Sequence, residues 1–313
     1  MGRAANRLTT KQKISLISIV IAIIISLVVY IYSTYFSDKE NISDTDTQTT
    51  TLYEEGEVSE PKYTYHFIDV GQGDSTLIIS DTGSVLIDAG PGDHDLLTLE
   101  YIGNVTDSID YMVITHPHED HIGTAEEIIT NFNVKNIIMP NVSVGTVVFT
   151  KMLDAIELKG CNVYEATPGD VYNSGDIRID ILGSAVTDDD NLNNVSVFTK
   201  ITTGEVTAMF TGDAEKKAEN AILKMYSDEM LDADIFHAGH HGSTTSNTEK
   251  FLKAVSPRYA VISCGRGNEY GHPHYEILDL FESLGIIQYR TDTMGSIVFV
   301  TDGKNINISG SYT

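Results

Sequence analysis

The distribution of apolar residues divides the chain into three parts. Residues 14–32 form one apolar run without a charge, and as a helix rising about 1.5 Å per residue this run is long enough to cross the core of a bilayer. Residues 33–62 are rich in Ser, Thr, Asp and Glu, which is typical of a flexible acidic tether. From Tyr63 onward, short apolar runs alternate with Gly, Asp and Asn. This pattern predicts one globular domain over 63–313.

Within this domain the apolar runs predict many short strands separated by helices. Strands are expected at 63–69, 75–80, 84–88, 110–115, 136–139, 162–165, 177–182, 196–201, 206–210, 233–238, 258–263, 286–290, 296–300 and 305–309. Helices are expected at 94–102, 124–131, 147–158, 214–227, 248–255 and 275–284. Two strand-rich halves with intervening helices predict an α/β fold in which two sheets pack face to face with helices outside, a four-layer αββα sandwich.

Charged residues beside the apolar run predict its orientation. Arg3, Arg7, Lys11 and Lys13 precede it and the acidic tether follows, so the positive-inside rule places residues 1–13 in the cytoplasm and the domain outside the cell. A cleaved signal peptide is the alternative, but the run is long for one and no Ala-x-Ala-like site follows. We therefore expect an uncleaved, single-pass transmembrane anchor in the cell membrane with an extracellular C-terminal domain.

Composition changes this picture in two respects. The formal net charge of −25 disfavours nucleic-acid partners, because an acidic surface repels phosphate backbones. It does not exclude DNA as a substrate, since bound divalent cations could make a cleft locally positive. Cys161 and Cys264 lie far apart in sequence, and they either form a disulfide outside the cell or are two small buried side chains.

The candidate chemistry centres on Thr-His-Pro-His-Glu-Asp-His-Ile-Gly at 115–123. Four side chains of ligand type fall within six positions, namely His116, His118, Asp120 and His121. The apolar residues before them predict a buried strand, so we expect the cluster on the loop at its C-terminal end, where all four side chains can turn inward. Imidazole and carboxylate groups suit zinc and its first-row neighbours, and this spacing offers enough donors for two divalent ions.

Three later segments also carry ligand-type residues. Phe-Thr-Gly-Asp at 210–213 ends in Asp213, which either caps a helix or bridges two cations. Phe-His-Ala-Gly-His-His-Gly-Ser at 236–243 offers His240 and His241, and the sequence does not decide which of them binds metal. Tyr-Gly-His-Pro-His at 270–274 places His272 either on the surface or in the active site.

Three aspartates stand at the ends of predicted strands, namely Asp69, Asp74 and Asp88. Asp88 suits a position behind the metal ligands, because ligating imidazoles usually need a hydrogen-bond partner that orients them. Asp69 and Asp74 suit the same supporting role, and stabilisation of a turn fits them nearly as well.

These motifs, in this order, resemble the metallo-β-lactamase superfamily, and within it the hydrolase-like domain of ComEC-type competence proteins, over roughly residues 63–310. The superfamily's His-x-His-x-Asp-His signature matches 116–121, its Thr-Gly-Asp aspartate matches Asp213 and its strand-end aspartate matches Asp88. Closer to the ComEC-like branch are Phe-Ile-Asp-Val-Gly-Gln-Gly-Asp (67–74), Gly-His-His-Gly-Ser (239–243), Tyr-Gly-His-Pro (270–273) and Arg-Thr-Asp (290–292). The resemblance implies the αββα sandwich, a dinuclear metal site and hydrolase activity.

The sequence departs from the superfamily pattern in one segment. Many members carry an isolated histidine where this chain, like the ComEC-like branch, reads Asn-Leu-Asn-Asn-Val-Ser (191–196). The resemblance then implies a first ion held by His116, His118 and Asp213 with water or Asn194. It implies a second ion held by Asp120, His121, Asp213 and either His240 or His241. The multi-helix channel of ComEC proteins has no counterpart in this sequence, so we do not expect a DNA pore.

The expected function is hydrolysis of a phosphodiester by metal-activated water, with two zinc ions or, as the alternative, manganese. Asp120 would hold the water and accept its proton, and His241 or His272 would protonate or stabilise the leaving oxygen. Three other functions remain open: a nuclease accessory to DNA uptake, a hydrolase of β-lactams or other acyl esters, and a non-catalytic metal-binding scaffold. A steep fall of affinity with salt would mark a nuclease.

Overall fold

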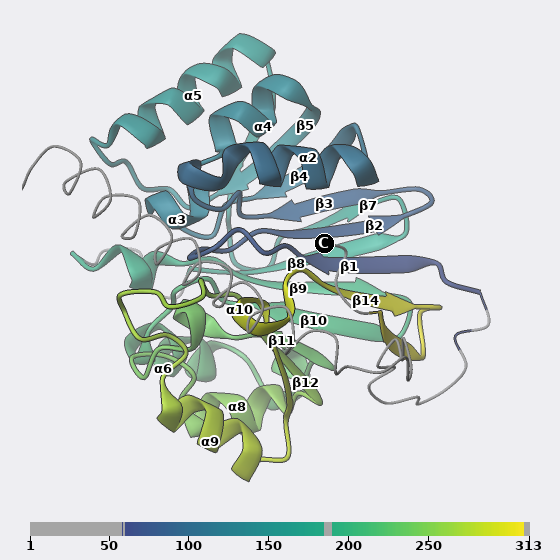
Figure 1. Ribbon diagram of the computed structural model, residues 1–313, viewed down its shortest axis with the longest axis vertical. Helices are drawn as coiled ribbons and strands as arrows, with labels where there is room; N and C mark the ends of the chain where they lie inside the picture. The colour runs from purple at the N-terminus through teal and green to yellow at the C-terminus, as the bar shows by residue number, and fades with distance from the viewer. Residues whose placement is uncertain (1–57, 59, 185–189, 310–313) are drawn as a thin grey trace, which may run out of the picture. The chain divides into compact units, whose positions relative to one another are not determined.

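The computed structural model describes residues 58, 60–184 and 190–309 (Figure 1). The predicted anchor at 14–32, the basic segment at 1–13 and nearly all of the tether at 33–62 lie outside these residues. Among the helices of the described ranges, none is both long enough and apolar enough to cross a membrane.

One half of the fold is a mixed sheet of eight strands in the order β15-β14-β1-β2-β3-β4-β5-β6. The pairs from β15 to β3 are antiparallel, and the pairs from β3 to β6 are parallel. Its strands are β1 (Tyr63–Phe67), β2 (Thr76–Ser80), β3 (Ser84–Ile87), β4 (Ser108–Val113), β5 (Asn133–Met139), β6 (Asn162–Glu165), β14 (Ile297–Thr301) and β15 (Ile306–Ser309).

The other half is a mixed sheet of seven strands in the order β13-β12-β11-β10-β9-β8-β7. The pairs from β10 to β13 are parallel, and the pairs from β7 to β10 are antiparallel. Its strands are β7 (Val171–Ser174), β8 (Ile177–Gly183), β9 (Phe198–Thr203), β10 (Val206–Phe210), β11 (Ile235–His237), β12 (Tyr259–Ile262) and β13 (Ile287–Arg290).

Helices cover the outer face of each sheet (Figure 1). One apolar cluster, which includes Ile128 and Met152, joins α2, α4 and α5 to the first sheet. Another, which includes Ile222 and Phe281, joins α6, α8 and α9 to the second sheet. The α-helices are α2 (Asp95–Val105), α3 (Glu119–Ile122), α4 (Ala125–Asn131), α5 (Val147–Lys159), α6 (Lys216–Met225), α7 (Asp228–Leu231), α8 (Glu249–Val255), α9 (Tyr275–Ser283) and α10 (Thr291–Met294).

A further apolar cluster fills the space between the two sheets. The buried ring of Phe67 on β1 lies 6.2 Å from that of Phe210 on β10 and 5.6 Å from that of Phe299 on β14. Because successive side chains of a strand point to opposite faces, Phe67 faces this core while His66 lines the outer side of the sheet. Burial on both faces opposes a shift in strand register, and a fixed register positions the strand ends that carry the candidate ligands.

The prediction of two packed sheets with helices outside is confirmed, with differences in small elements. Strand β7 was not predicted, because its sequence Val-Tyr-Asn-Ser is mixed in polarity and most of it is partly exposed at the sheet edge. The single-turn helices α3, α7 and α10 were also not predicted, since four residues are too few to show a helical period. Both cysteines are free, so the disulfide alternative is wrong.

A buried carboxyl joins two of the outer helices and predicts a pH effect on stability. Glu219 of α6 accepts hydrogen bonds from the backbone N–H groups of Asn247 and Thr248, at 2.6 and 3.0 Å, where α8 begins. Burial raises the pKa of Glu219 from 4.5 to about 7. The folded state therefore holds this proton more tightly than the unfolded chain, and its stabilising effect is full below pH 4.5 and is lost as the pH rises through 7.

We expect Glu219→Gln to remove this part of the pH dependence. Between pH 4.5 and 8, the free energy of unfolding of Glu219→Gln relative to the parent should rise by up to about 3 kcal/mol. Urea unfolding at several pH values measures the difference, with the exposed Glu229→Gln as control. Parallel pH profiles for Glu219→Gln and the parent would contradict the expectation.

Candidate metal centre

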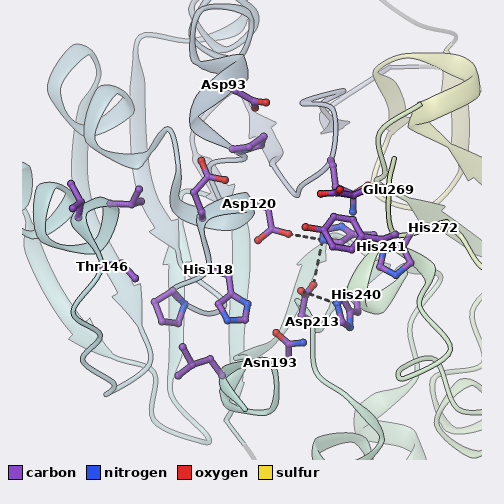
Figure 2. Close-up of a pocket in the computed structure, with 18 residues that line it drawn as sticks. Asp93, His118, Asp120, Thr146, Asn193, Asp213, His240, His241, Glu269 and His272 are labelled. Atoms are coloured by element: carbon purple, nitrogen blue, oxygen red, sulfur yellow. Dashed lines mark hydrogen bonds and ion pairs between the residues drawn. The ribbon is translucent and has the colours of Figure 1, made fainter. Parts of the chain in front are cut away.

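The segments that carry the candidate ligands all follow strands. Asp88 directly follows β3, the segment 115–123 follows β4, Asp213 follows β10, and the pair His240–His241 follows β11. β3 is parallel to β4, and β10 is parallel to β11, so within each sheet these carboxyl ends lie at the same edge. Side chains from both sheets meet around one cavity (Figure 2).

Asp120, His121, Asp213 and His241 form a compact set that we call the four-ligand group. Nε2 of His121 lies 3.2 Å from Oδ1 of Asp213. Nε2 of His241 lies 3.1 Å from Oδ2 of Asp120 and 3.7 Å from Oδ1 of Asp213. Two imidazoles and two carboxylates thus surround one point, a donor set that suits a first-row divalent ion. Of the two neighbouring histidines, the geometry places His241 here.

His116, His118 and Asp213 form a second set, the three-ligand group. Nε2 of His116 lies 2.9 Å from Nδ1 of His118 and 3.7 Å from Oδ2 of Asp213. His240 approaches the same carboxylate oxygen, with its Nε2 at 3.6 Å, and its Nδ1 lies 3.0 Å from the hydroxyl of Thr245. The two oxygens of Asp213 therefore face different groups, as expected for a carboxylate that bridges two cations.

Two buried aspartates orient the imidazoles of the four-ligand group. Oδ2 of Asp88 lies 2.8 Å from Nδ1 of His121, and Asp88 also accepts hydrogen bonds from the N–H and the hydroxyl of Thr115. Oδ1 of Asp74 lies 3.0 Å from Nδ1 of His241. A proton held on Nδ1 leaves Nε2 free to act as a metal ligand. Asp88 therefore contacts a candidate ligand from the end of β3, and Asp74 contacts one from the loop between β1 and β2.

The backbone is strained at three of these positions. Asp88, His240 and His241 have φ values of 56°, 51° and 52°, in the left-handed region where the side chain of an L-residue crowds the backbone. Strained conformations of this kind persist where the surrounding structure imposes them, and they cluster at functional sites. Here they allow two adjacent histidines to reach different oxygens of the same carboxylate, Asp213.

The sequence predicted that the histidine-rich segment is a loop, but part of this segment is helical. Asp120 and His121 lie on the single-turn helix α3, and the two preceding histidines, His116 and His118, lie in the irregular segment before it. Gly123 follows this helix, and a Cβ atom there would lie 2.2 Å from the backbone nitrogen of Gly92. The close contact between α3 and the loop after β3 therefore requires glycine, which explains the Ile-Gly that ends the motif.

Unpartnered buried atoms in the cluster fit bound cations. Oδ1 of Asp213 and Nε2 of His121 lie 3.2 Å apart, yet neither makes a hydrogen bond of good geometry with any described residue, a costly state for buried polar atoms unless a further group binds them. Burial favours a raised pKa for Asp213, but the charges of His121 and His241 hold it well below its ordinary value. Burial favours a lowered pKa for His121, but Asp213, Asp88 and Asp120 raise it well above. A potential that attracts a proton also attracts a divalent cation, so the residues fit a two-metal centre.

The cavity beside the cluster has a volume of about 760 Å³. His272 lines it, with its ring centroid 5.4 Å from that of His240 (Figure 2). Of the two interpretations open for His272, the geometry therefore favours a place in the candidate active site. Tyr270, which also lines the cavity, stacks on His272 with a centroid distance of 5.7 Å.

Two further residues were predicted to support the ligands, Asp69 and Asn194, and the structure separates them from the cavity lining. Asp69 is exposed and its Oδ1 accepts a hydrogen bond from the N–H of Gly71 at 3.2 Å, so it stabilises its own turn. Asn194 is buried but does not line the cavity, whereas its neighbour Asn193 does. Both lie in the 3₁₀ turn η2 (Leu192–Val195), where successive side chains point in different directions, and the sequence alone does not reveal which of them faces the cavity.

The chain is similar in sequence to curated proteins of known name. The chain is 31% identical over 268 residues to ComE operon protein 3 of Bacillus subtilis, which covers 79% of this chain and 33% of that protein. It is 28% identical over 230 residues to Recombination protein 2 of Haemophilus influenzae, which covers 71% of this chain and 27% of that protein. The chain thus spans about a third or less of the length of these two curated relatives.

Solved structures and a family profile complete the comparison. The metallo-β-lactamase fold protein YhfI from Bacillus subtilis superposes with a TM-score of 0.52 at 12% identity, over 76% of this chain and 99% of its own. Igni18, a metallo hydrolase from Ignicoccus hospitalis, superposes with a TM-score of 0.53 at 17% identity, over 75% of this chain and 98% of its own. Both show the fold alone. Because residues 68–266 match the profile of the metallo-beta-lactamase superfamily, the chain belongs to that superfamily.

Proposed function

We propose that the chain is a metal-dependent hydrolase that cleaves a phosphodiester. The observation that carries this proposal is Asp213, whose two carboxylate oxygens face two separate groups of metal-type ligands. When two divalent ions are bound, they would activate water and stabilise charge on the ester oxygens. The negative charge of a phosphodiester suits such a pair of cations better than a neutral acyl ester does.

The chain's own residues suit three tasks in this reaction. Asp120 faces the cavity and can hold an attacking water and accept its proton. His241 suits metal binding better than proton transfer to the leaving oxygen, because both of its ring nitrogens already face carboxylates. Asp74 lies beside Nδ1 and Asp120 lies beside Nε2. His272 has a buried Nδ1 without a partner in the described residues, and burial together with nearby His241 lowers its pKa to about 4. As a neutral imidazole, His272 would stabilise the leaving oxygen by donating a hydrogen bond.

Turnover of bis(p-nitrophenyl) phosphate by the purified full chain tests this proposal. We expect hydrolysis with added zinc or manganese and its loss with EDTA, while the chromogenic β-lactam nitrocefin is turned over more slowly or not at all. Hydrolysis of nitrocefin alone would overturn the phosphodiester proposal in favour of acyl substrates. Binding of metal without turnover of either compound would favour a non-catalytic scaffold.

A nuclease accessory to DNA uptake is the second candidate, because the names of the curated relatives refer to recombination and competence, as in Competence protein ComA of Neisseria gonorrhoeae. The net charge of −25 opposes it. Degradation of single-stranded DNA with an affinity that falls steeply between about 50 and 200 mM salt would support a nuclease. A shallow dependence for a small ester would support the first proposal.

We further propose that residues 14–32 anchor the protein in the cell membrane with residues 63–313 outside. The support is the uncharged apolar run and the four basic residues before it. Retention of the full chain in membranes after carbonate washing, and digestion of its C-terminal domain by protease added to cells with an intact membrane, are the expected results. Release of the protein by carbonate would contradict the anchor.

A further inference from the structure

The lining of the cavity carries an unusual balance of charge for a site that is proposed to bind a phosphodiester. Besides Asp120 and Asp213, its carboxylates are Asp93, Glu119 and Glu269, and neither lysine nor arginine is among the lining residues (Figure 2). Asp93, Glu119 and Glu269 are exposed at the rim. Enzymes that hold extended polyanions line the path with basic groups. Here only bound cations would supply positive charge, and they would act on one phosphate.

Asn193 adds a buried hydrogen-bond acceptor to this lining. Its exposed fraction is 8%, and its Nδ2 donates to Oε1 of Glu215 at 3.3 Å. Its Oδ1 is buried and has no hydrogen-bond partner among the described residues. If the amide of Asn193 were turned by 180°, Oδ1 would face the Glu215 carboxylate, and two acceptor oxygens would repel each other. Glu215 therefore fixes the orientation of the Asn193 amide. A buried acceptor beside the cavity without a partner indicates a donor that the ligand brings.

An exposed aromatic ring completes the rim. Tyr270 is 61% exposed and stacks on His272 with an interplanar angle of 22°. Its second face is therefore available to a group that enters the cavity beside Glu269. The face of an aromatic ring attracts cations, so Tyr270 adds to the preference that the carboxylates create.

From these observations we infer that the substrate is a phosphodiester whose alcohol carries an ammonium group, as in an aminoethyl ester. This inference rests on the proposed phosphodiester hydrolysis. The phosphate would lie at the metal centre, and the ammonium group would lie at the rim, near Glu119, Glu269 and Tyr270. A polynucleotide would instead place neighbouring phosphates against the rim carboxylates, which repel them.

Three p-nitrophenyl phosphodiesters test the inference with the purified full chain and zinc or manganese. Their second alcohols are 2-aminoethyl, the isosteric neutral n-propyl, and the 5′-hydroxyl of thymidine. In each reaction one water adds to phosphorus, the bond to p-nitrophenolate breaks, and a proton is released. Because the leaving group is constant, differences in kcat/KM report recognition of the second alcohol. We expect the aminoethyl ester to exceed both others by about tenfold or more.

Matched variants assign the preference to the rim. Glu119→Gln combined with Glu269→Gln should reduce the ratio of aminoethyl to propyl turnover towards one. Glutamine at 119 can still accept the hydrogen bond from the N–H of Gly92 that Glu119 accepts at 2.9 Å. The control is Glu157→Gln combined with Glu229→Gln, two exposed carboxylates outside the lining, which should leave the ratio unchanged.

The possible outcomes distinguish failure of the proposed function from failure of this inference. Hydrolysis of none of the three esters would overturn the proposed function and this inference with it. Hydrolysis of the propyl or thymidine ester as fast as the aminoethyl ester would overturn the inference alone. If the preference holds, cleavage of phosphatidylethanolamine in vesicles would identify a lipid source, and cleavage only of glycerophosphoethanolamine would identify a soluble one.

Discussion

Replacing Asp213 by alanine should remove both the metal centre and the activity. One oxygen of Asp213 lies 3.2 Å from His121 and the other lies 3.7 Å from His116, so a single substitution takes a ligand from each group. We expect bound metal to fall from about two ions to fewer than one per chain. We expect kcat/KM for bis(p-nitrophenyl) phosphate to fall by at least about 10³-fold. Metal analysis after dialysis and initial rates measure the two effects.

A control variant and a check of folding make this result specific. Asp228→Ala removes a carboxylate from the exposed helix α7 and should leave metal content and rate unchanged. Asp213→Ala itself should remain folded, because its backbone N–H still donates to Ser196 and His121 and His241 keep the hydrogen bonds of their Nδ1 atoms to Asp88 and Asp74. A folded Asp213→Ala protein that binds two ions with the affinity of the parent would contradict the bridging role.

The strands, and the ligand-type residues that follow them, could be predicted from the sequence because apolar periodicity and clusters of His and Asp are local signals. β6 and β10 begin and end at the predicted residues, since polar or glycine-containing segments bound each apolar run. The same signals placed the ligand-type clusters after strands, and a mixed α/β fold brings the carboxyl ends of its parallel strands to one edge. Local pattern thus determines most of the architecture.

What the sequence could not show depends on contacts between distant residues and on turn geometry. Asp74 orients His241 across 167 positions, and no local pattern reports such a pair. The choice between His240 and His241 depends on two successive residues with left-handed φ, a conformation that histidine rarely adopts. Asn193 faces the cavity because of the 3₁₀ turn that carries it.

The site therefore rests on hydrogen bonds behind the ligands as much as on the ligands. Asp88 and Asp74 are buried, come from the first sheet's side of the fold, and orient histidines on α3 and after β11. His121 and His241 then present Nε2 to the same oxygen of Asp213, at 3.2 and 3.7 Å. Because each ring is fixed by its own carboxylate, loss of one carboxylate should disturb one ligand and leave the other in place.

Replacing Asp88 by asparagine should weaken metal binding without removing any ligand. Oδ1 of Asp88 accepts the N–H of Thr115, and Oδ2 lies 2.8 Å from Nδ1 of His121. In Asp88→Asn the amide oxygen can still accept the hydrogen bond from the N–H of Thr115. The amide NH₂ group then takes the place of Oδ2 and faces Nδ1 of His121. Nδ1 of His121 must then accept, and the proton of the neutral ring moves to Nε2, the nitrogen that faces Asp213. We expect metal affinity to fall by roughly 10–100-fold, measured by competition with a chelator.

Asp69→Asn is the matched control for this substitution, because Asp69 also follows a strand of the same sheet but is exposed, and its carboxylate accepts a hydrogen bond from its own turn. It should bind metal like the parent. Asp88→Ala separates the tautomer effect from the loss of charge: without an NH₂ group opposite Nδ1, His121 can keep its proton there through water, and affinity should fall less than in Asp88→Asn. An Asp88→Asn protein with the metal affinity of Asp69→Asn would show that His121 does not depend on Asp88 for its orientation.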